Sequence, residues 1–143
     1  MIAIGCDHGG YELKKFLIKH LEEKGIEYKD FGCDNTDSCD YPEYGHAVAR
    51  SVASGECEKG IVICSTGIGI SIAANKVKGI RAALCTNSLM ARLTREHNDA
   101  NVLALGAYIA GPQLAVDIMD TFLSTDFSNG ERHVRRVGKI ENV

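Results

Sequence analysis

A cysteine followed by a glycine-rich loop is the segment of this chain whose residue types best suit acid-base chemistry. Cys64 ends an apolar run, and the following residues 65–71 include Thr66, Gly67 and Gly69 ahead of an alanine-rich stretch. Backbone N–H groups at the start of a helix converge on anions, and the helix dipole favours negative charge there. The same field would lower the pKa of the Cys64 thiol, which would favour a thiolate base or nucleophile. The loop itself would suit a phosphate or an enolate oxygen.

The loop matches neither of two common phosphate-binding motifs. Ile72 stands where a dinucleotide-binding loop has its third glycine, and no P-loop Gly-Lys-Ser or Gly-Lys-Thr follows. Between Glu58 and Glu96 the chain has six basic residues and no acidic one, which favours an anionic ligand. Alternatives stay open: the glycines could serve a simple turn, the basic residues a solvated face, and Cys64 the core as a small apolar side chain.

Other polar residues flank other predicted strands. They are Asp7 and His8 after the first apolar run, His97 and Asn98 before the last one, and Arg132 and Arg136 in the polar C-terminal tail. Ligands of open parallel sheets bind beyond the carboxyl ends of the strands, so we expect these groups to meet at that edge, with the tail folded back to it. The paired arginines match the geometry of a phosphate. Alternatively, His97 only caps its helix, and the tail is only solvated.

Strands and helices alternate along the chain. Apolar runs predict strands at residues 2–6, 26–31, 61–64, 80–85 and 101–106, each followed by a segment with helical spacing of apolar residues. In the last of these helices, which Pro112 opens, we expect Leu114, Ile118 and Phe122 to face the core. The alternation predicts one three-layer α/β/α domain over residues 1–143, Rossmann-like, with a five-stranded parallel sheet and a polar tail at 127–143.

Composition excludes several classes of protein. With 45 % hydrophobic and 24 % charged residues, the chain can build a core, unlike a disordered chain. No apolar run approaches a membrane span and no signal peptide is evident, so we expect a cytoplasmic protein. The net charge of -3 gives no overall basic field for nucleic acid or an anionic membrane. Six cysteines without a CxxC pair and five scattered histidines predict free thiols and no metal site.

Taken together, the motifs of this chain resemble those of type B ribose-5-phosphate isomerases along almost the whole sequence. They are Gly5-Cys6-Asp7-His8, Asp40-Tyr41-Pro42, residues 64–76, Gly79-Ile80-Arg81-Ala82, residues 96–101 and Arg132-His133. The resemblance implies a sheet of strand order 2-1-3-5-4 and a homodimer with active sites shared across the interface, with further pairing into tetramers left open. It also implies metal-independent interconversion of ribose 5-phosphate and ribulose 5-phosphate through a cis-enediolate, a step of the pentose phosphate pathway, without a cofactor.

The resemblance assigns a role to each candidate residue. Cys64 resembles the base that moves the proton between C2 and C1; some members use a nearby glutamate that is absent here. The anion hole would comprise Thr66 and the amides from Gly67 to Ser71, with Ser65, Gly67, Gly69 and Ser71 lying against the substrate. His97, aided by Asp7, would open the furanose ring. Tyr41 and Asn98 would contact sugar hydroxyls, and His8, Arg132 and Arg136 would hold the phosphate.

One position departs from the family pattern. Where many members have Gly-x-Arg after the fifth strand, this chain has Gly106-Ala107-Tyr108, which removes a phosphate contact. The same family includes isomerases of allose 6-phosphate and galactose 6-phosphate, so a six-carbon substrate is an alternative. Two other classes are a non-catalytic flavodoxin-like nucleotide-binding module and a cysteine hydrolase that uses Cys64 and His97. The first of these leaves Cys64, His97 and the tail arginines without a role.

Overall fold

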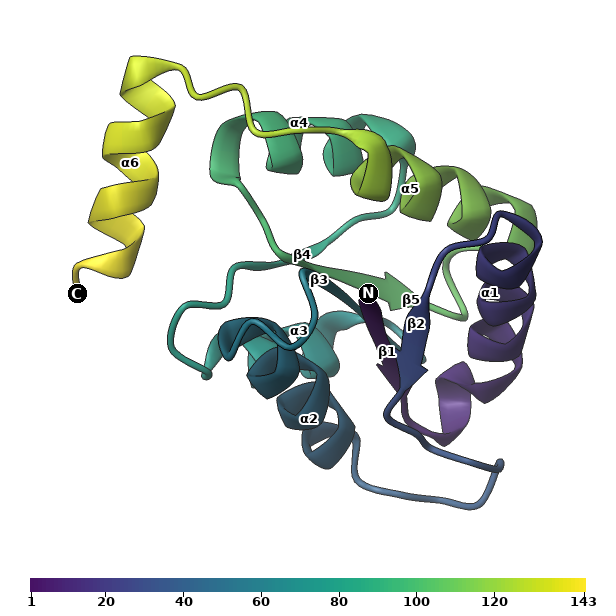
Figure 1. Cartoon of the computed structure of the whole chain (residues 1–143). Coiled ribbons are helices and arrows are strands. Elements are labelled where there is room, and N and C mark those ends of the chain that lie inside the picture. Colours follow the sequence, from purple (N-terminus) through teal and green to yellow (C-terminus); the bar gives the residue numbers. More distant parts are fainter.

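The computed structural model describes all 143 residues, and its strands form one parallel sheet in the order β2-β1-β3-β5-β4 (Figure 1). The strands are β1 (Ile2–Cys6), β2 (Tyr28–Asp30), β3 (Lys59–Cys64), β4 (Ala82–Leu84) and β5 (Val102–Gly106). The expected fold class and strand order are confirmed. The edge strands β2 and β4 are shorter than predicted, because each pairs with a neighbour on one side only.

Helices cover both faces of the sheet. On one face lie α1 (Tyr11–Glu23), α4 (Ser88–Asn98) and α5 (Pro112–Ser124), and on the other lie α2 (Tyr41–Ala53) and α3 (Ile68–Asn75) (Figure 1). A short 3-10 turn, η1 (His8–Gly10), joins β1 to α1. The polar tail forms a sixth α-helix, α6 (Glu131–Glu141), which stands at one end of the molecule beside α4.

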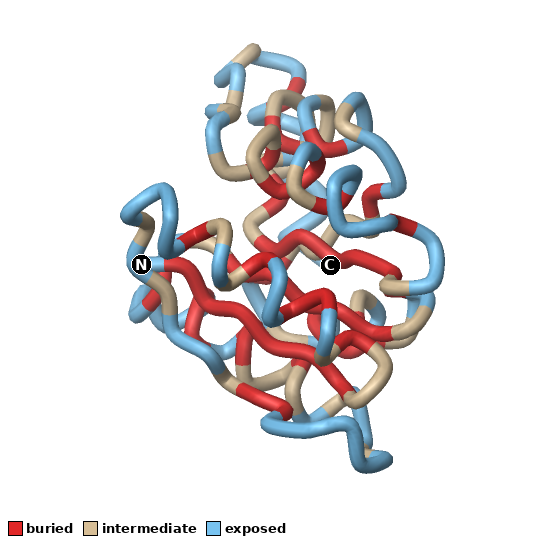
Figure 2. Tube along the Cα trace, turned by 90° about the vertical axis from the view of Figure 1, so that its right-hand side faces the viewer, coloured by how far each residue is buried: buried red, intermediate tan, exposed pale blue.

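The sheet lies between two apolar cores. Ile61 and Leu103 face the α1, α4 and α5 side, whereas Val62 and Ala104 face α2 and α3, and all four are fully buried. Burial on both faces explains the continuous apolar runs of β1 and β5, in which every residue is buried. Figure 2 shows buried segments through the middle of the molecule and exposed ones around its outside. None of the helices combines the length and apolar character needed to cross a membrane.

One expected core position is wrong. Ile118 and Phe122 are fully buried, but Leu114 is 39 % exposed. Residues four apart on an α-helix are displaced by about 40° around its axis, so Leu114 lies about 80° away from Phe122. Ala115 occupies the buried position in the first turn of α5 instead.

Candidate active site

The carboxyl ends of β1 and β3 bring Asp7 and Cys64 to the same edge of the sheet. Cys6 pairs with Ile63 across the two strands, and the Asp7 N–H group donates to the Ile63 carbonyl at 3.1 Å. The Asp7 carboxylate is buried and accepts the N–H groups of Gly9 at 2.9 Å and Gly10 at 3.2 Å. These bonds fix the carboxylate at the start of η1, next to the end of β3.

A turn after β3 directs a backbone amide at the Cys64 sulfur. The Gly67 N–H group donates to Cys64 Sγ at 3.1 Å, and the thiol is 6 % exposed. Gly67 has a φ of 79°, and a Cβ there would lie 2.8 Å from the carbonyl carbon of Leu105. Glycine is therefore required at this position, both for the backbone conformation and for the close approach of the loop to β5.

The start of α3 leaves two backbone amides free. Of the five amides expected to form an anion hole, that of Gly67 is bound to Cys64, that of Ile68 donates to Thr66 Oγ1 at 3.2 Å, and that of Ser71 donates to the Gly67 carbonyl at 3.2 Å. The N–H groups of Gly69 and Ile70 make no hydrogen bond, as is usual in a first helical turn. They can therefore bind an anionic oxygen beside the thiol.

Two ring side chains lie around this loop. A Cβ on Gly69 would lie 2.8 Å from the ring of Tyr41, which begins α2, so that ring lies directly over the loop. His8 Nδ1 accepts the N–H group of Cys39 at 3.2 Å, which orients the imidazole.

Ser65 packs against Gly9, and its carbonyl accepts the N–H group of Tyr108 at 2.9 Å. Tyr108, 77 % exposed, thus belongs to the same edge.

His97, Asn98, Arg132 and Arg136 do not reach that edge in the same chain, which corrects the expectation that all candidate residues meet there. The helix α4 begins near the carboxyl edge, after β4, and runs back to the amino edge, where Asn98 ends it before β5. The arrowhead of β5 points away from α6 (Figure 1). Helices that connect parallel strands return to the start of the next strand, so a residue just before a strand lies at the amino edge.

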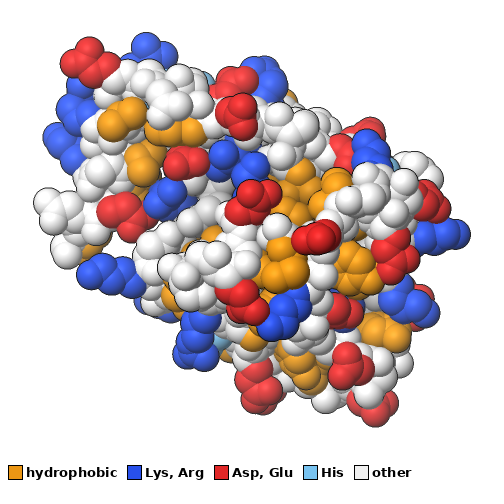
Figure 3. Space-filling model, viewed as in Figure 1, with side chains coloured by type: hydrophobic (Ala, Val, Ile, Leu, Met, Phe, Trp, Pro, Cys, Tyr) orange, Lys and Arg blue, Asp and Glu red, His pale blue; other side chains and the backbone are white.

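At the amino edge, His97 and the start of α6 form a second polar site. The ring of His97 stacks on that of His133, with centroids 4.4 Å apart and planes inclined by 9°. Arg132 and Arg135 line a cavity of about 560 Å³ together with both histidines. Burial and the positive charges of His97, Arg132 and Arg136 lower the pKa of His133. Basic groups are exposed at this end of the molecule, upper left in Figure 3.

Sequence reasoning missed His133 and Arg135 as lining residues. The spacing of Arg132 and Arg136 predicts a phosphate-binding pair, whereas nothing in the sequence around His133 predicts a role for its ring. The stack with His97 joins two helices that are distant in sequence, and no local spacing indicates it. Asn98, by contrast, is exposed and lines a different groove, beside Arg81 and Glu141.

Two of the other thiols, those of Cys6 and Cys85, are deeply buried. All six cysteines are free, and burial raises the pKa of Cys85 to about 11 and that of Cys6 further still. Such thiols stay protonated and unreactive at neutral pH. No three His, Cys, Asp or Glu side chains are gathered closely enough to hold a metal ion. Whether the reaction is independent of metal stays a prediction.

Comparisons with known proteins identify the relatives of this chain. Ribose-5-phosphate isomerase B of Escherichia coli is 49 % identical over 142 residues, which cover 99 % of this chain and 95 % of the relative. The structure of Clostridium thermocellum ribose-5-phosphate isomerase B is 60 % identical, with a TM-score of 0.97 and coverage of 99 % of this chain and 95 % of that one. That of the Thermotoga maritima enzyme is 51 % identical, with a TM-score of 0.97 and coverage of 99 % and 97 %.

The family model named Ribose/Galactose Isomerase matches residues 2–140, which is nearly the whole chain. The chain therefore belongs to the ribose/galactose isomerase family.

Proposed function

We propose that this protein interconverts ribose 5-phosphate and ribulose 5-phosphate by moving a proton between C2 and C1. The observation that carries the proposal is the buried Cys64 thiol beside the free amides of Gly69 and Ile70. A base next to preorganised N–H donors suits a reaction in which a carbon loses a proton while the adjacent oxygen gains negative charge. The relatives from Escherichia coli and Clostridium thermocellum are named for this isomerisation.

In the proton-transfer step, Cys64 acts as the base. Its thiolate removes the proton from C2 of the open-chain aldose, the electrons move into the carbonyl, and a cis-enediolate forms. The Gly69 and Ile70 amides and the Thr66 hydroxyl donate to the developing oxyanion, which is where donors fixed in advance have the largest effect. The hydroxyl proton then passes from O2 to O1, the thiol returns its proton to C1 as the C2 carbonyl forms, and the ketose leaves. Ser65 and Ser71 line the same loop on either side of these groups.

Before that step the furanose ring must open, and the phosphate must be held. His97 moves the proton between the ring oxygen and the anomeric hydroxyl, with Asp7 oriented toward the same sugar. Tyr41 and Asn98 contact sugar hydroxyls. His8, Arg132 and Arg136 bind the phosphate, for which guanidinium groups suit the charge and the geometry.

A second copy of this chain completes the site. Cys64 and His97 lie at opposite edges of the sheet in one chain, so a site that contains both needs His97, Arg132 and Arg136 from a partner copy. Apolar side chains of α3, which directly follows the Cys64 loop, are exposed in the single chain, as expected for a surface that a partner covers; they are Ile68 at 53 % and Ile72 at 57 %. We therefore propose a homodimer with two shared sites.

The direct test is formation of ketose from a panel of aldose phosphates by the purified protein, with and without a chelator. We expect ribose 5-phosphate to have the highest kcat/KM, and a chelator to leave that rate unchanged, because the site supplies both a base and anion donors. A higher kcat/KM for allose 6-phosphate would assign the enzyme to a six-carbon substrate. A rate restored only by added divalent metal would contradict the mechanism.

A further inference from the structure

We propose that Arg81 is a positioning residue, whose single guanidinium group holds both His97 and helix α6 in place. Arg81 lies just before β4, and no step of the reaction described above uses it. The inference rests on the proposed function, in which His97 opens the sugar ring and the arginines of α6 bind the phosphate. What it adds is the group that holds these two parts of the site together.

The guanidinium group binds the backbone directly after His97. Arg81 Nε donates to the Asn98 carbonyl at 3.0 Å, and Nη2 donates to the Asp99 carbonyl at 2.8 Å. Carbonyls at the end of a helix have no partner within the helix, so these two bonds cap α4. The last residue of α4 and the one after it are thus fixed by Arg81, and His97 is their immediate neighbour.

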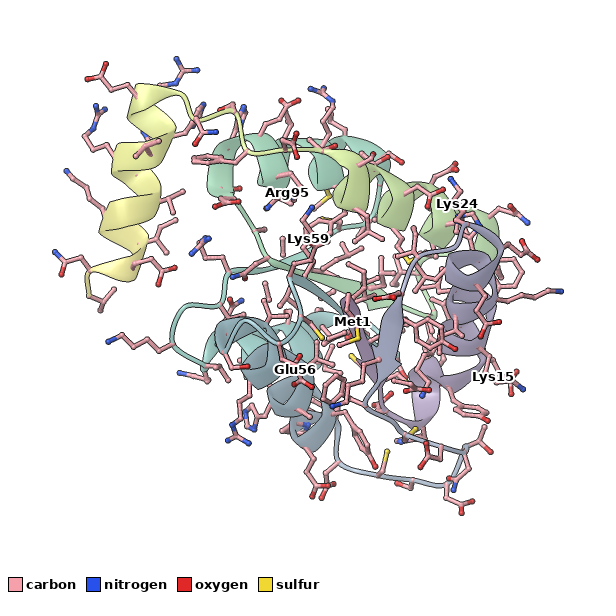
Figure 4. The ribbon with its side chains drawn as sticks, viewed as in Figure 1. Met1, Lys15, Lys24, Glu56, Lys59 and Arg95 are labelled. Carbon is pink, nitrogen blue, oxygen red and sulfur yellow. The ribbon has the colours of Figure 1, made fainter.

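The turn at Asp99, directly after α4, is bound by two arginine side chains. Asp99 has a φ of 46°, a left-handed conformation uncommon for a residue other than glycine. Its carboxylate lies 3.5 Å from Arg81 Nη2 and 2.9 Å from Nη1 of the buried Arg95, which is labelled on α4 in Figure 4. Arg95 Nη1 also donates to the Ala100 carbonyl at 2.6 Å. Because two cations bind this carboxylate, the backbone at the end of α4 is held in one conformation.

The third guanidinium nitrogen of Arg81, Nη1, binds a side chain of α6. Arg81 Nη1 donates to Glu141 Oε1 at 2.6 Å, in an ion pair whose side chains are 16 % and 35 % exposed. It is the only ion pair or side-chain hydrogen bond between α6 and the rest of the chain. The start of α6 is held by the stack of His133 on His97. Arg81 therefore fixes the end of α6 and, through Asn98 and Asp99, the histidine on which its beginning rests.

Arginine suits this task for a geometric reason. Its planar fork directs several N–H donors at fixed angles. Here Nε and Nη2 donate to the Asn98 and Asp99 carbonyls, whereas Nη1 donates to Glu141. Glu141 accepts a hydrogen bond from Nη1 alone. Substitution of Glu141 should therefore loosen α6 while Arg81 still caps the end of α4. The two contributions of Arg81 can therefore be separated by mutation.

The test compares Arg81→Gln and Glu141→Gln with a matched control, Glu56→Gln. Glu56 (labelled in Figure 4) also forms one partly exposed ion pair, with Lys29 at 2.7 Å, but it lies away from α4 and α6. Rates are measured with ribose 5-phosphate, which is mainly a furanose, and with ribulose 5-phosphate, which is acyclic because its O5 carries the phosphate. A ring-opening defect slows only the first substrate.

We expect Arg81→Gln to lower kcat for ribose 5-phosphate by roughly ten-fold or more, while kcat for ribulose 5-phosphate changes by less than about two-fold, since small displacements of a catalytic group are costly. KM should rise for both sugars because the phosphate arginines move with α6. Glu141→Gln should raise KM for both sugars by roughly three-fold or more and leave kcat near that of Glu56→Gln. Equal losses of kcat on both sugars in Arg81→Gln would indicate a merely structural role and overturn the proposal.

A second measurement does not depend on activity. Stacking shifts the NMR signals of the His97 and His133 ring protons, and we expect these signals to move in Arg81→Gln but not in Glu56→Gln. Amide hydrogen exchange in α6 should be faster in both Arg81→Gln and Glu141→Gln. Unchanged ring signals and exchange rates would overturn the proposal even if the wild-type protein isomerises ribose 5-phosphate. If the wild type is inactive on pentose phosphates, the proposed function fails while these measurements still decide the role of Arg81.

Discussion

Cys64 is a buried side chain at the end of β3 whose sulfur accepts the Gly67 N–H group, and the free amides of Gly69 and Ile70 follow in the same loop and helix start. If it is the base, Cys64→Ala should lower kcat by about 10² to 10⁴-fold, the usual effect of losing a general base. KM should change little, because the thiol holds no part of the sugar in its ground state. Steady-state rates with ribose 5-phosphate measure both constants.

Cys57 provides the control for this substitution. It is 1 % exposed and belongs to the same apolar core as Cys64, but it lies before the start of β3, away from the loop. Cys57→Ala removes the same atoms from the same core and should keep kcat within about two-fold of wild type, apart from a loss of stability. A Cys64→Ala protein as active as Cys57→Ala would remove Cys64 from the mechanism.

Tyr108 is the residue at which the family pattern fails. Its N–H group is bound to Ser65, and its exposed side chain lies at the edge where the substrate is proposed to bind. A hydrogen bond to a charged group contributes on the order of 1.5 to 3 kcal/mol, and about 1.4 kcal/mol corresponds to a factor of ten. If position 108 faces the phosphate, Tyr108→Arg should lower KM for ribose 5-phosphate by roughly ten-fold, with kcat little changed.

The neighbouring Ile109 is also exposed and supplies the control, since Ile109→Arg adds the same charge one residue away. A similar fall in KM for both variants would indicate general electrostatic attraction and not a specific contact. If Tyr108 instead makes room for a longer sugar, Tyr108→Arg should depress activity on a six-carbon phosphate alone. An unchanged KM for every substrate would place position 108 outside the site.

At the scale of elements, the sequence predicted the strands and the loop after β3 better than it predicted the placement of His97. Apolar runs and the Ser65 to Ser71 segment carry local signals, because a buried strand and a glycine turn each impose requirements on neighbouring residues. The edge at which His97 lies follows from the direction of α4. Because α4 connects β4 to β5, its last residues must lie at the amino edge, and the order of the elements along the chain was enough to predict this. The strand order came from the family resemblance, since alternation alone is compatible with several orders.

The docking of α6 could not be predicted from the sequence. It depends on a stack between His97 and His133 and on one ion pair between Arg81 and Glu141, which join residues far apart in the chain. The spacing of Arg132 and Arg136 correctly indicated one side of a helix. It contained no information on the element against which that helix packs.

The contact between α4 and α6 should weaken in acid. Burial and the charges of His97, Arg132 and Arg136 lower the pKa of His133 in the folded protein from its ordinary 6.5. The unfolded chain therefore takes up this proton at a higher pH than the folded protein does. The stability contributed by neutral His133 is complete above about pH 6.5 and is lost as the pH falls toward the lowered pKa.

Unfolding in urea from about pH 8 to about pH 5 measures this contribution when wild type is compared with His133→Asn. We expect the wild-type free energy of unfolding to fall more steeply than that of the variant below about pH 6.5. The variant keeps every other titratable group, so the difference between the two curves isolates His133. Parallel curves would mean that His133 is as easily protonated in the folded protein as in the unfolded chain.

At the scale of the whole molecule, the mechanism proposed above divides its groups between the two edges of the sheet. The carboxyl edge has the thiol, the free amides and Tyr41, and the amino edge has His97 with the arginines of α6. No hinge motion within one domain of this size brings opposite edges of a sheet together. Symmetric pairing of two copies does, because each copy then offers its amino edge to the carboxyl edge of the other.

This arrangement predicts that two inactive proteins can restore each other. Cys64→Ala and His97→Asn should each be inactive with ribose 5-phosphate, because each damages both sites of its own dimer. After subunit exchange, half of the dimers are mixed if pairing is random, and each mixed dimer has one intact site and one doubly damaged site. Activity should therefore approach about a quarter of the wild-type value at equal total protein. Exchange is verified with differently tagged subunits, and a mixture that exchanges fully but stays inactive would place Cys64 and His97 of the working site in one chain.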